Sequence, residues 1–107
     1  TGAYVALSLA IRRMMSNGQL TENPLLHAVA AVSVGIVHGE ALLDLCYQED
    51  VEASVDLNLV MNSAGDFIEL QGTGEESTFT EAQLARMLSL GRTGIEQLLA
   101  AQQEALR

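Results

Sequence analysis

The sequence predicts an α+β fold of two layers, in which a mainly antiparallel or mixed β-sheet packs on helices. Apolar residues recur at helical spacing at both ends of the chain, while the middle holds four short segments of β-branched or alternating residues. Short turns link these segments in pairs, which favours antiparallel hairpins. With 107 residues, 49% of them hydrophobic, the chain is expected to belong to a single domain that spans residues 1–107.

Helices are predicted at the two ends. Residues 3–16 carry small and apolar side chains at near-helical spacing, and Asn17 and Gly18 then supply a stop signal. Thr80 and Gln83 form a capping box ahead of a long amphipathic helix that reaches Leu106. The chain begins inside the first helix without a capping residue before it, and we therefore expect a piece of a longer protein.

Four strands are predicted between these helices, with a short helical segment inserted after the second strand. The apolar run at residues 28–37 combines β-branched and small residues, and His38-Gly39 marks a turn into the next strand. A polar segment at 47–54 suits a short helix, and Val55 begins a strand that alternates polar and apolar residues. The predicted strands are residues 28–37, 41–46, 55–61 and 67–71.

Composition excludes several classes of protein. The net charge is −9 with no lysine, so the chain lacks the basic surface that binds nucleic-acid backbones. One cysteine, Cys46, and two histidines exclude a disulfide and a zinc site defined by spacing; we expect Cys46 to be a packed strand residue. No apolar run reaches the roughly 20 residues of a membrane helix. Arg12 and Arg13 follow the apolar start instead of preceding it, which argues against an export signal. The single cysteine fits a protein of the reducing cytoplasm.

Candidate chemistry is concentrated in an acidic cluster between two apolar strands, formed by Asp44, Glu49, Asp50, Glu52 and Asp56. On one helix Asp50 and Asp56 would lie about 240° apart, so they meet only if a helix ends and a strand begins between them. Two neighbouring carboxylates suit Mg²⁺. The alternative, which composition alone favours, is the solvated face of a short helix.

Glycines flank Thr73 in the segment QGTGEE. Gly72 and Gly74 could let the backbone approach a phosphate. The alternative is a turn that ends the strand, and the residues alone leave both interpretations open.

Several segments together resemble the ribonuclease PH family, in the same order and over essentially the whole chain: TGAYVAL, AVSVGIV, LLDLCYQEDVEASVDLNLVM, FIELQGTGEE and GIEQLLAAQQEAL. Departures are slight, such as Leu57 where the family often has methionine. The resemblance implies a ribosomal-protein-S5-domain-2-like α+β unit. It also implies phosphorolysis, in which inorganic phosphate, as co-substrate, trims the 3′ ends of precursor tRNA and releases nucleoside diphosphates.

By motif match the resemblance assigns the catalytic, metal-binding aspartates to Asp50 and Asp56, with Mg²⁺ or Mn²⁺ as the metal. The family's phosphate-binding arginines, one of them in a Gly-Thr-Arg motif just before the segment that matches Thr1, have no counterpart here. The resemblance therefore implies the C-terminal part of one ribonuclease PH domain, inactive without its N-terminal half and assembled as a hexameric ring of dimers. The alternatives are a non-catalytic ring subunit or scaffold of an exosome-like assembly, and a relative of polynucleotide phosphorylase.

Overall fold

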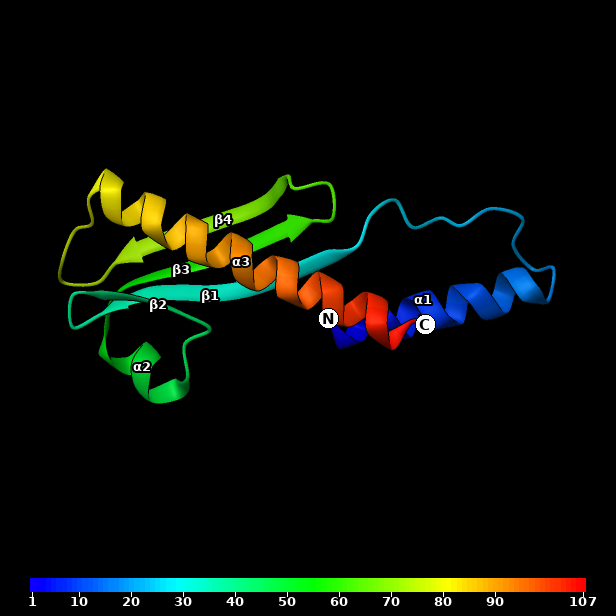
Figure 1. Cartoon of the computed structure of the whole chain (residues 1–107), viewed down its shortest axis with the longest axis horizontal. Helices are drawn as coiled ribbons and strands as arrows, with labels where there is room; N and C mark the ends of the chain where they lie inside the picture. The colour runs from blue at the N-terminus through cyan, green and yellow to red at the C-terminus, as the bar shows by residue number, and fades with distance from the viewer.

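Seven helices and strands follow one another in the computed structural model, which describes residues 1–107 (Figure 1). The order of elements is the predicted one: a helix, two strands, a short helix, two strands and a long helix. They are α1 (Gly2–Ser16), β1 (Val29–Val37), β2 (Glu40–Leu43), α2 (Tyr47–Glu52), β3 (Ala53–Asn62), β4 (Phe67–Gly74) and α3 (Glu81–Ala105).

The four strands form one sheet in the order β2-β1-β3-β4, and every neighbouring pair is antiparallel. A two-residue turn joins β1 to β2, with His38 at φ 51° and Gly39 at φ 79°, as the tight hairpins that match strand twist require. At the other end of the sheet, the side chain of Asn62 accepts hydrogen bonds from the backbone amides of Ala64 and Asp66 and closes the β3–β4 turn. The α+β class that the sequence predicted is confirmed.

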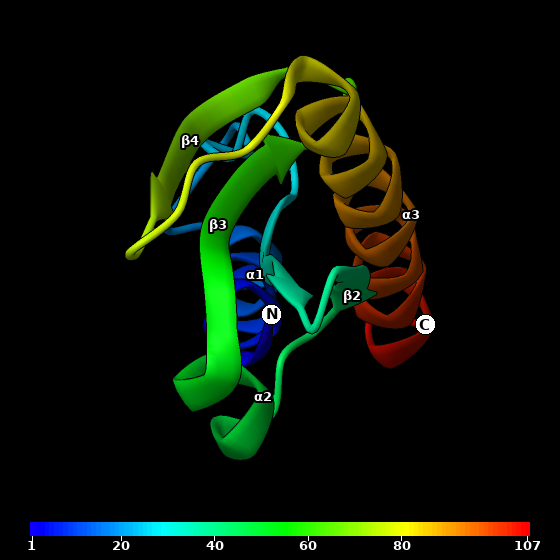
Figure 2. The same ribbon diagram turned by 90° about the vertical axis from the view of Figure 1, so that its left-hand side faces the viewer.

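Helix α3 covers one face of the sheet and contacts β1, β2 and β3 (Figure 2). Between them lies the core, in which Val34, Leu59 and Met87 are fully buried. The helix starts as predicted: Thr80 Oγ1 accepts from the amide of Gln83 at 3.1 Å, and Gln83 Oε1 accepts from the amide of Thr80 at 2.8 Å. The sheet and α3 are the two layers of the fold.

The second strand is shorter than predicted, and the expectation for Cys46 is wrong. Strand β2 ends at Leu43, because Asp44 takes the left-handed conformation, with φ 58°, and turns the chain out of the sheet. Cys46 is consequently exposed and lies at the N-cap of α2. It does not pack in a strand.

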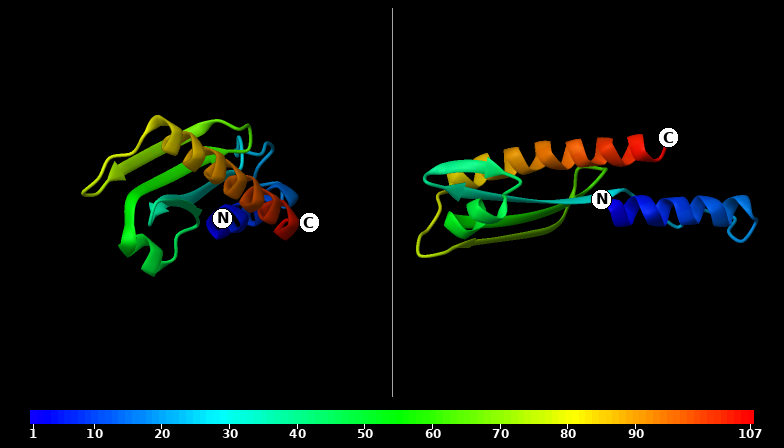
Figure 3. Two further views of the ribbon diagram at one scale, coloured as in Figure 1. Left: turned by 60° about the vertical axis from the view of Figure 1, so that its left-hand side comes forward. Right: turned by 90° about the horizontal axis from the view of Figure 1, so that it is seen from below.

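Helix α1 extends beyond the sheet and lies beside the C-terminal end of α3 (Figure 3). The molecule measures 55 × 25 × 19 Å, and its Cα radius of gyration of 16.8 Å exceeds the ~13 Å of a compact domain of about 100 residues. Only Ser8 and Ile11 of α1 are buried, while Leu7 and Leu9 are about half exposed. None of the helices has both the length and the apolar character needed to cross a bilayer.

Candidate functional site

Asp50 and Asp56 come together where α2 ends and β3 begins. The helix ends at Glu52, and Ala53 takes extended backbone angles, φ −68° and ψ 131°, at once. This is the break that the sequence predicted between the two aspartates. Asp50 approaches from the last turn of α2 and Asp56 from the strand, and the two carboxyl groups are near enough for Asp50 to affect the pKa of Asp56.

The environment of the pair favours the protonated form of Asp56. Partial burial raises the pKa of Asp56 first, and a hydrogen bond with Asp50 together with the negative charges of Asp50 and Glu75 raises it further. When both carboxylates are ionised, Asp50 and Asp56 repel each other in a partly desolvated environment. A proton or a cation would relieve that repulsion.

The other acidic residues of the predicted cluster have separate roles. Glu49 accepts a hydrogen bond from the backbone amide of Cys46 at 2.9 Å, and the hydrogen bonds from Cys46 lower the pKa of Glu49. Glu52 lies 3.0 Å from Nε2 of His38. Asp44 is exposed at the turn after β2.

No cation in the chain neutralises Asp50 or Asp56. The only ion pairs are His38 with Glu52 and Arg107 with Glu104. The two aspartates are therefore an acidic pair without a positive partner. Asp50 is exposed on the short helix α2, as the solvated-face alternative expects, whereas Asp56 is half-buried on strand β3.

Close packing across β1 helps to place α2 beside Asp56. In the register of the sheet, Asp56 lies between Gly35 of β1 and Thr73 of β4. A Cβ on Gly35 would lie 2.5 Å from the carbonyl oxygen of Val55 and 2.7 Å from Cδ1 of Leu45, so only glycine lets Leu45 lie against the strand. This contact holds the start of the β2–α2 connection against the sheet, on the approach to Asp50.

A row of uncharged polar side chains lies beside the pair, and sequence reasoning missed it. Asn58 follows Asp56 by two residues and so points to the same face of the sheet, away from α3. Its Cα partners are Ser33 on β1 and Gln71 on β4. Oγ of Ser33 donates to Oδ1 of Asn58 at 2.9 Å. The alternation of the strand placed Asn58 beside Asp56, but the pairing of Ser33 depends on a strand register that the sequence does not specify.

The segment QGTGEE ends a strand instead of cradling an anion. Gly72 lies within β4, where a Cβ would come within 2.9 Å of Cδ1 of Leu57. Gly74 closes the strand, and a Cβ there would collide with the carbonyl oxygen of Ser77. The amide that follows, on Glu75, already donates to the carbonyl oxygen of Ser54 at 2.9 Å. The strand-ending interpretation describes these glycines.

The acidic pair could supply only carboxylate oxygens, which are hard ligands, to a metal ion. No group of three or more His, Cys, Asp or Glu side chains is arranged to hold a metal ion. Two carboxylates are nevertheless what Mg²⁺ usually takes from a protein, because it keeps several waters and completes its shell with substrate phosphates; Mn²⁺ accepts similar oxygen ligands. The donor set therefore fits Mg²⁺ or Mn²⁺ and does not fit the closed shell of a structural zinc ion.

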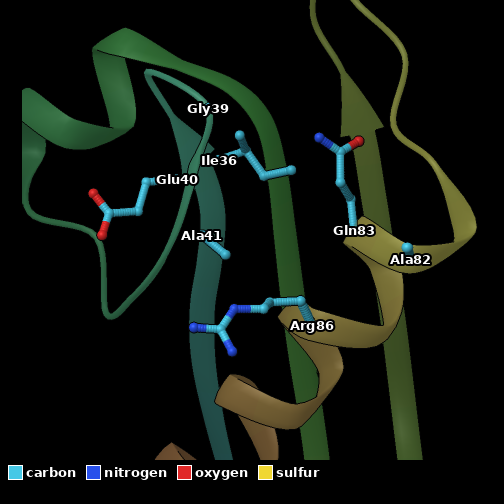
Figure 4. Close-up of a pocket in the computed structure, with 7 residues that line it drawn as sticks. All are labelled: Ile36, Gly39, Glu40, Ala41, Ala82, Gln83 and Arg86. Atoms are coloured by element: carbon cyan, nitrogen blue, oxygen red, sulfur yellow. The ribbon is translucent and has the colours of Figure 1, made fainter.

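A pocket of about 320 Å³ lies apart from the pair, between the β1–β2 hairpin and the start of α3 (Figure 4). Arg86 extends along it without an ion pair, and Gln83 on its rim is already engaged in the helix cap. Its remaining lining is Ile36, Gly39, Glu40, Ala41 and Ala82. No residue of the acidic pair lines this pocket.

Comparison with known proteins identifies the family. Residues 27–94 match the 3′ exoribonuclease family, domain 2. The chain belongs to this family. Within the 3′ exoribonuclease family it is 55% identical over 106 residues to ribonuclease PH of Corynebacterium efficiens and 53% identical to that of Exiguobacterium sibiricum. These alignments cover 99% of the chain but only 43% and 42% of the relatives, at their C-terminal part.

The fold is also found in a solved structure, that of rice (Oryza sativa) Rrp46. The superposition has a TM-score of 0.52 at 21% identity and covers 74% of this chain and 34% of that one. At this identity the likeness supports the fold. The acidic pair and the polar row lie inside the region that matches the exoribonuclease family, whereas α1 precedes it.

Proposed function

We propose that this chain is the metal-binding half of a phosphate-dependent 3′ to 5′ exoribonuclease, a tRNA nucleotidyltransferase that trims precursor tRNA and releases nucleoside diphosphates. The observation that carries the proposal is the pair Asp50 and Asp56, which lies in a domain of the 3′ exoribonuclease family without a cation to neutralise it. The relatives that the chain matches are named ribonuclease PH.

The reaction places two anions against each other. An oxygen of inorganic phosphate forms a bond to the 3′-terminal phosphorus of the RNA, the bond from that phosphorus to the preceding 3′ oxygen breaks, and a nucleoside diphosphate leaves. Because both reactants are negative, positioning and charge neutralisation account for most of the catalysis.

Asp50 and Asp56 would hold Mg²⁺ or Mn²⁺ through their carboxylate oxygens. The metal would supply positive charge to the crowded phosphate oxygens. Burial and the nearby negative charges raise the pKa of Asp56 and favour its protonated form, whereas a bound cation would favour the ionised form, so metal binding would release a proton when the pair is protonated.

The phosphate site and the cations that attract RNA are expected in an N-terminal half of the same protein. The chain spans less than half the length of its ribonuclease PH relatives, and its five arginines make no ion pair with the aspartates. Helix α1 supports such a partner, because residues 2–11 contain no charged residue, yet most of their side chains are exposed. A helix that is apolar on all sides is normally buried. We infer that α1 packs on that half, that both halves form one ribonuclease PH domain, and that such domains assemble as a hexameric ring of dimers in the cytoplasm.

The test uses the full-length protein, precursor tRNA labelled at its 3′ end, inorganic phosphate and Mg²⁺. Asp56→Asn and Asp50→Asn should each lower phosphorolysis about 100-fold or more, because each removes an anionic metal ligand. Glu96→Gln, an exposed acid on α3, is the matched control and should leave the rate unchanged.

Three outcomes would contradict the proposal. Release of nucleoside monophosphates would indicate hydrolysis, and full activity of Asp56→Asn would remove the pair from the chemistry. RNA binding without any phosphate-dependent product, from the folded full-length protein, would favour the alternative of a non-catalytic ring subunit or scaffold.

A further inference from the structure

Asn58 is in an unusual place for an asparagine. It lies in the middle of β3, a central strand of the sheet, and its side chain is exposed on the face away from α3. Asparagine is depleted in strands, where β-branched and aromatic residues pack better. A residue that goes against local preference without a packing reason often marks a functional position.

The amide of Asn58 is held in one orientation. Its oxygen, Oδ1, accepts the hydroxyl hydrogen of Ser33 at 2.9 Å. Nδ2 carries two hydrogens and makes no hydrogen bond in the chain, so both donors are available on the exposed face. The cross-strand bond is worth only about 0.2–1 kcal/mol in sheet stability, which is little reason by itself to keep an amide there.

The two N–H groups of the Asn58 amide lie near the acidic pair. Residues two apart in a strand point to the same side of the sheet and lie about 7 Å from each other. Asn58 is therefore the next side chain after Asp56 on that side of β3. Its strand neighbours in the same row, Ser33 and Gln71, are uncharged and polar. Amide and hydroxyl groups of this kind contact the phosphates and sugars of nucleic acids without reading the sequence.

We propose that Asn58 is a positioning residue that holds the RNA backbone, with its amide group donating to a phosphate or ribose oxygen of the nucleotide that precedes the scissile bond. Ser33 fixes the amide so that its donors face the RNA. The inference rests on the proposed function, since it places the RNA end at Asp50 and Asp56, and it adds that the strand approaches along the open face of β3.

The test is Asn58→Asp in the full-length protein, with precursor tRNA and inorganic phosphate as substrates. The variant keeps an oxygen for Ser33 and replaces the two donors with an oxygen that repels a phosphate. The KM for RNA should rise about 10- to 100-fold, as expected for a lost hydrogen bond to a charged group. The kcat at saturating RNA should change less than about threefold, and the KM for phosphate should not change, because the residue binds RNA and does not touch the reacting atoms.

Asn62→Asp is the matched control. It adds the same charge to the same strand about 14 Å further along, and it keeps the side-chain oxygen that accepts from the amides of Ala64 and Asp66. Its KM for RNA should rise less than about threefold. Equilibrium binding of labelled RNA without inorganic phosphate, followed by fluorescence anisotropy, should separate the two variants in the same way.

Three results of these experiments would contradict either the role of Asn58 or the proposed function. Equal KM values for the Asn58 and Asn62 variants would overturn the role of Asn58, because the effect would then be one of net charge. A loss of kcat with unchanged KM would overturn it too, since that pattern belongs to a group at the reacting atoms. Failure of the unmodified protein to release nucleoside diphosphates would instead overturn the proposed function, and the inference with it.

Discussion

Replacing Gly91 with alanine should destabilise the protein, although alanine favours helices. A Cβ at this position of α3 would lie 2.5 Å from Cδ2 of Leu59 and 3.3 Å from Cγ2 of Val34. Ordinary contact between carbon atoms begins at about 3.5 Å, so Leu59 would have to move by about 1 Å. Both neighbours are 0% exposed, so neither can move outward into solvent.

The size of the effect follows from two opposing terms. Gly→Ala in a helix interior stabilises by about 0.8–1 kcal/mol, while overpacking of a filled core costs about 1–3 kcal/mol. Because Leu59 and Val34 are fully enclosed, we expect the upper part of that range and a net loss of about 1–2 kcal/mol. For a chain of this size that corresponds to a fall in Tm of roughly 4–16 °C.

Gly94→Ala provides the control on the same helix. Its Cβ would lie 2.8 and 3.1 Å from Cδ1 and Cδ2 of Leu43 and 3.3 Å from Cγ1 of Val32. Leu43 is only half-buried on the edge strand β2, so the end of its side chain can swing outward, and Val32, also half-buried, has to give by only a few tenths of an ångström. The helix-propensity term should then dominate, and stability should be unchanged or higher by up to about 1 kcal/mol. Urea unfolding followed by circular dichroism gives both free energies of unfolding. If Gly91→Ala proved as stable as Gly94→Ala, the geometric argument would be refuted.

Two further predictions concern Asp56 and Cys46. The pKa of Asp56 is raised in the folded state, so its stabilising contribution is complete below the unfolded pKa and is lost as the pH rises through the folded pKa. Asp56→Asn should therefore raise Tm at pH 7 relative to the unmodified protein in the absence of divalent metal, with no gain at pH 3; an equal gain at both pH values would contradict the cause given. Cys46 is an exposed free thiol, and a thiol reagent should modify it in the folded protein at a rate within about tenfold of that in urea, where thiols react freely. Strong protection would show that Cys46 is packed in the intact protein.

The elements that the sequence predicted are those specified by local signals. The capping box of Thr80 and Gln83 forms with both of its hydrogen bonds, because the three-residue spacing alone brings these groups together. The break between α2 and β3 could also be predicted, since the alternation that begins at Val55 cannot continue a helix. That break is what brings Asp50 to Asp56, so the pairing of the aspartates was within reach of the sequence.

Features that depend on tertiary contacts could not be predicted. Asp44 ends β2 by taking a positive φ, which is uncommon outside glycine and has no reliable local signal. The buried face of α3 includes Gln102, whose Nε2 donates to the carbonyl oxygen of Val29 at 2.9 Å, and no periodicity marks such a polar residue as buried. The pairing of Ser33 with Asn58 requires the register between β1 and β3, which is set by the whole sheet.

The absence of charge in the row beside the aspartates is consistent with a metal site. An arginine or lysine in place of Asn58 would lie about 7 Å from Asp56 and attract it by about 2 kcal/mol at an effective dielectric constant of 20. Such a charge would stabilise the ionised pair without a metal and would weaken metal binding by competition. Neutral donors hold a phosphate oxygen without that competition. The proposed RNA-binding surface beside the proposed metal site is in keeping with this argument, because Asn58, Ser33 and Gln71 present only amide and hydroxyl groups.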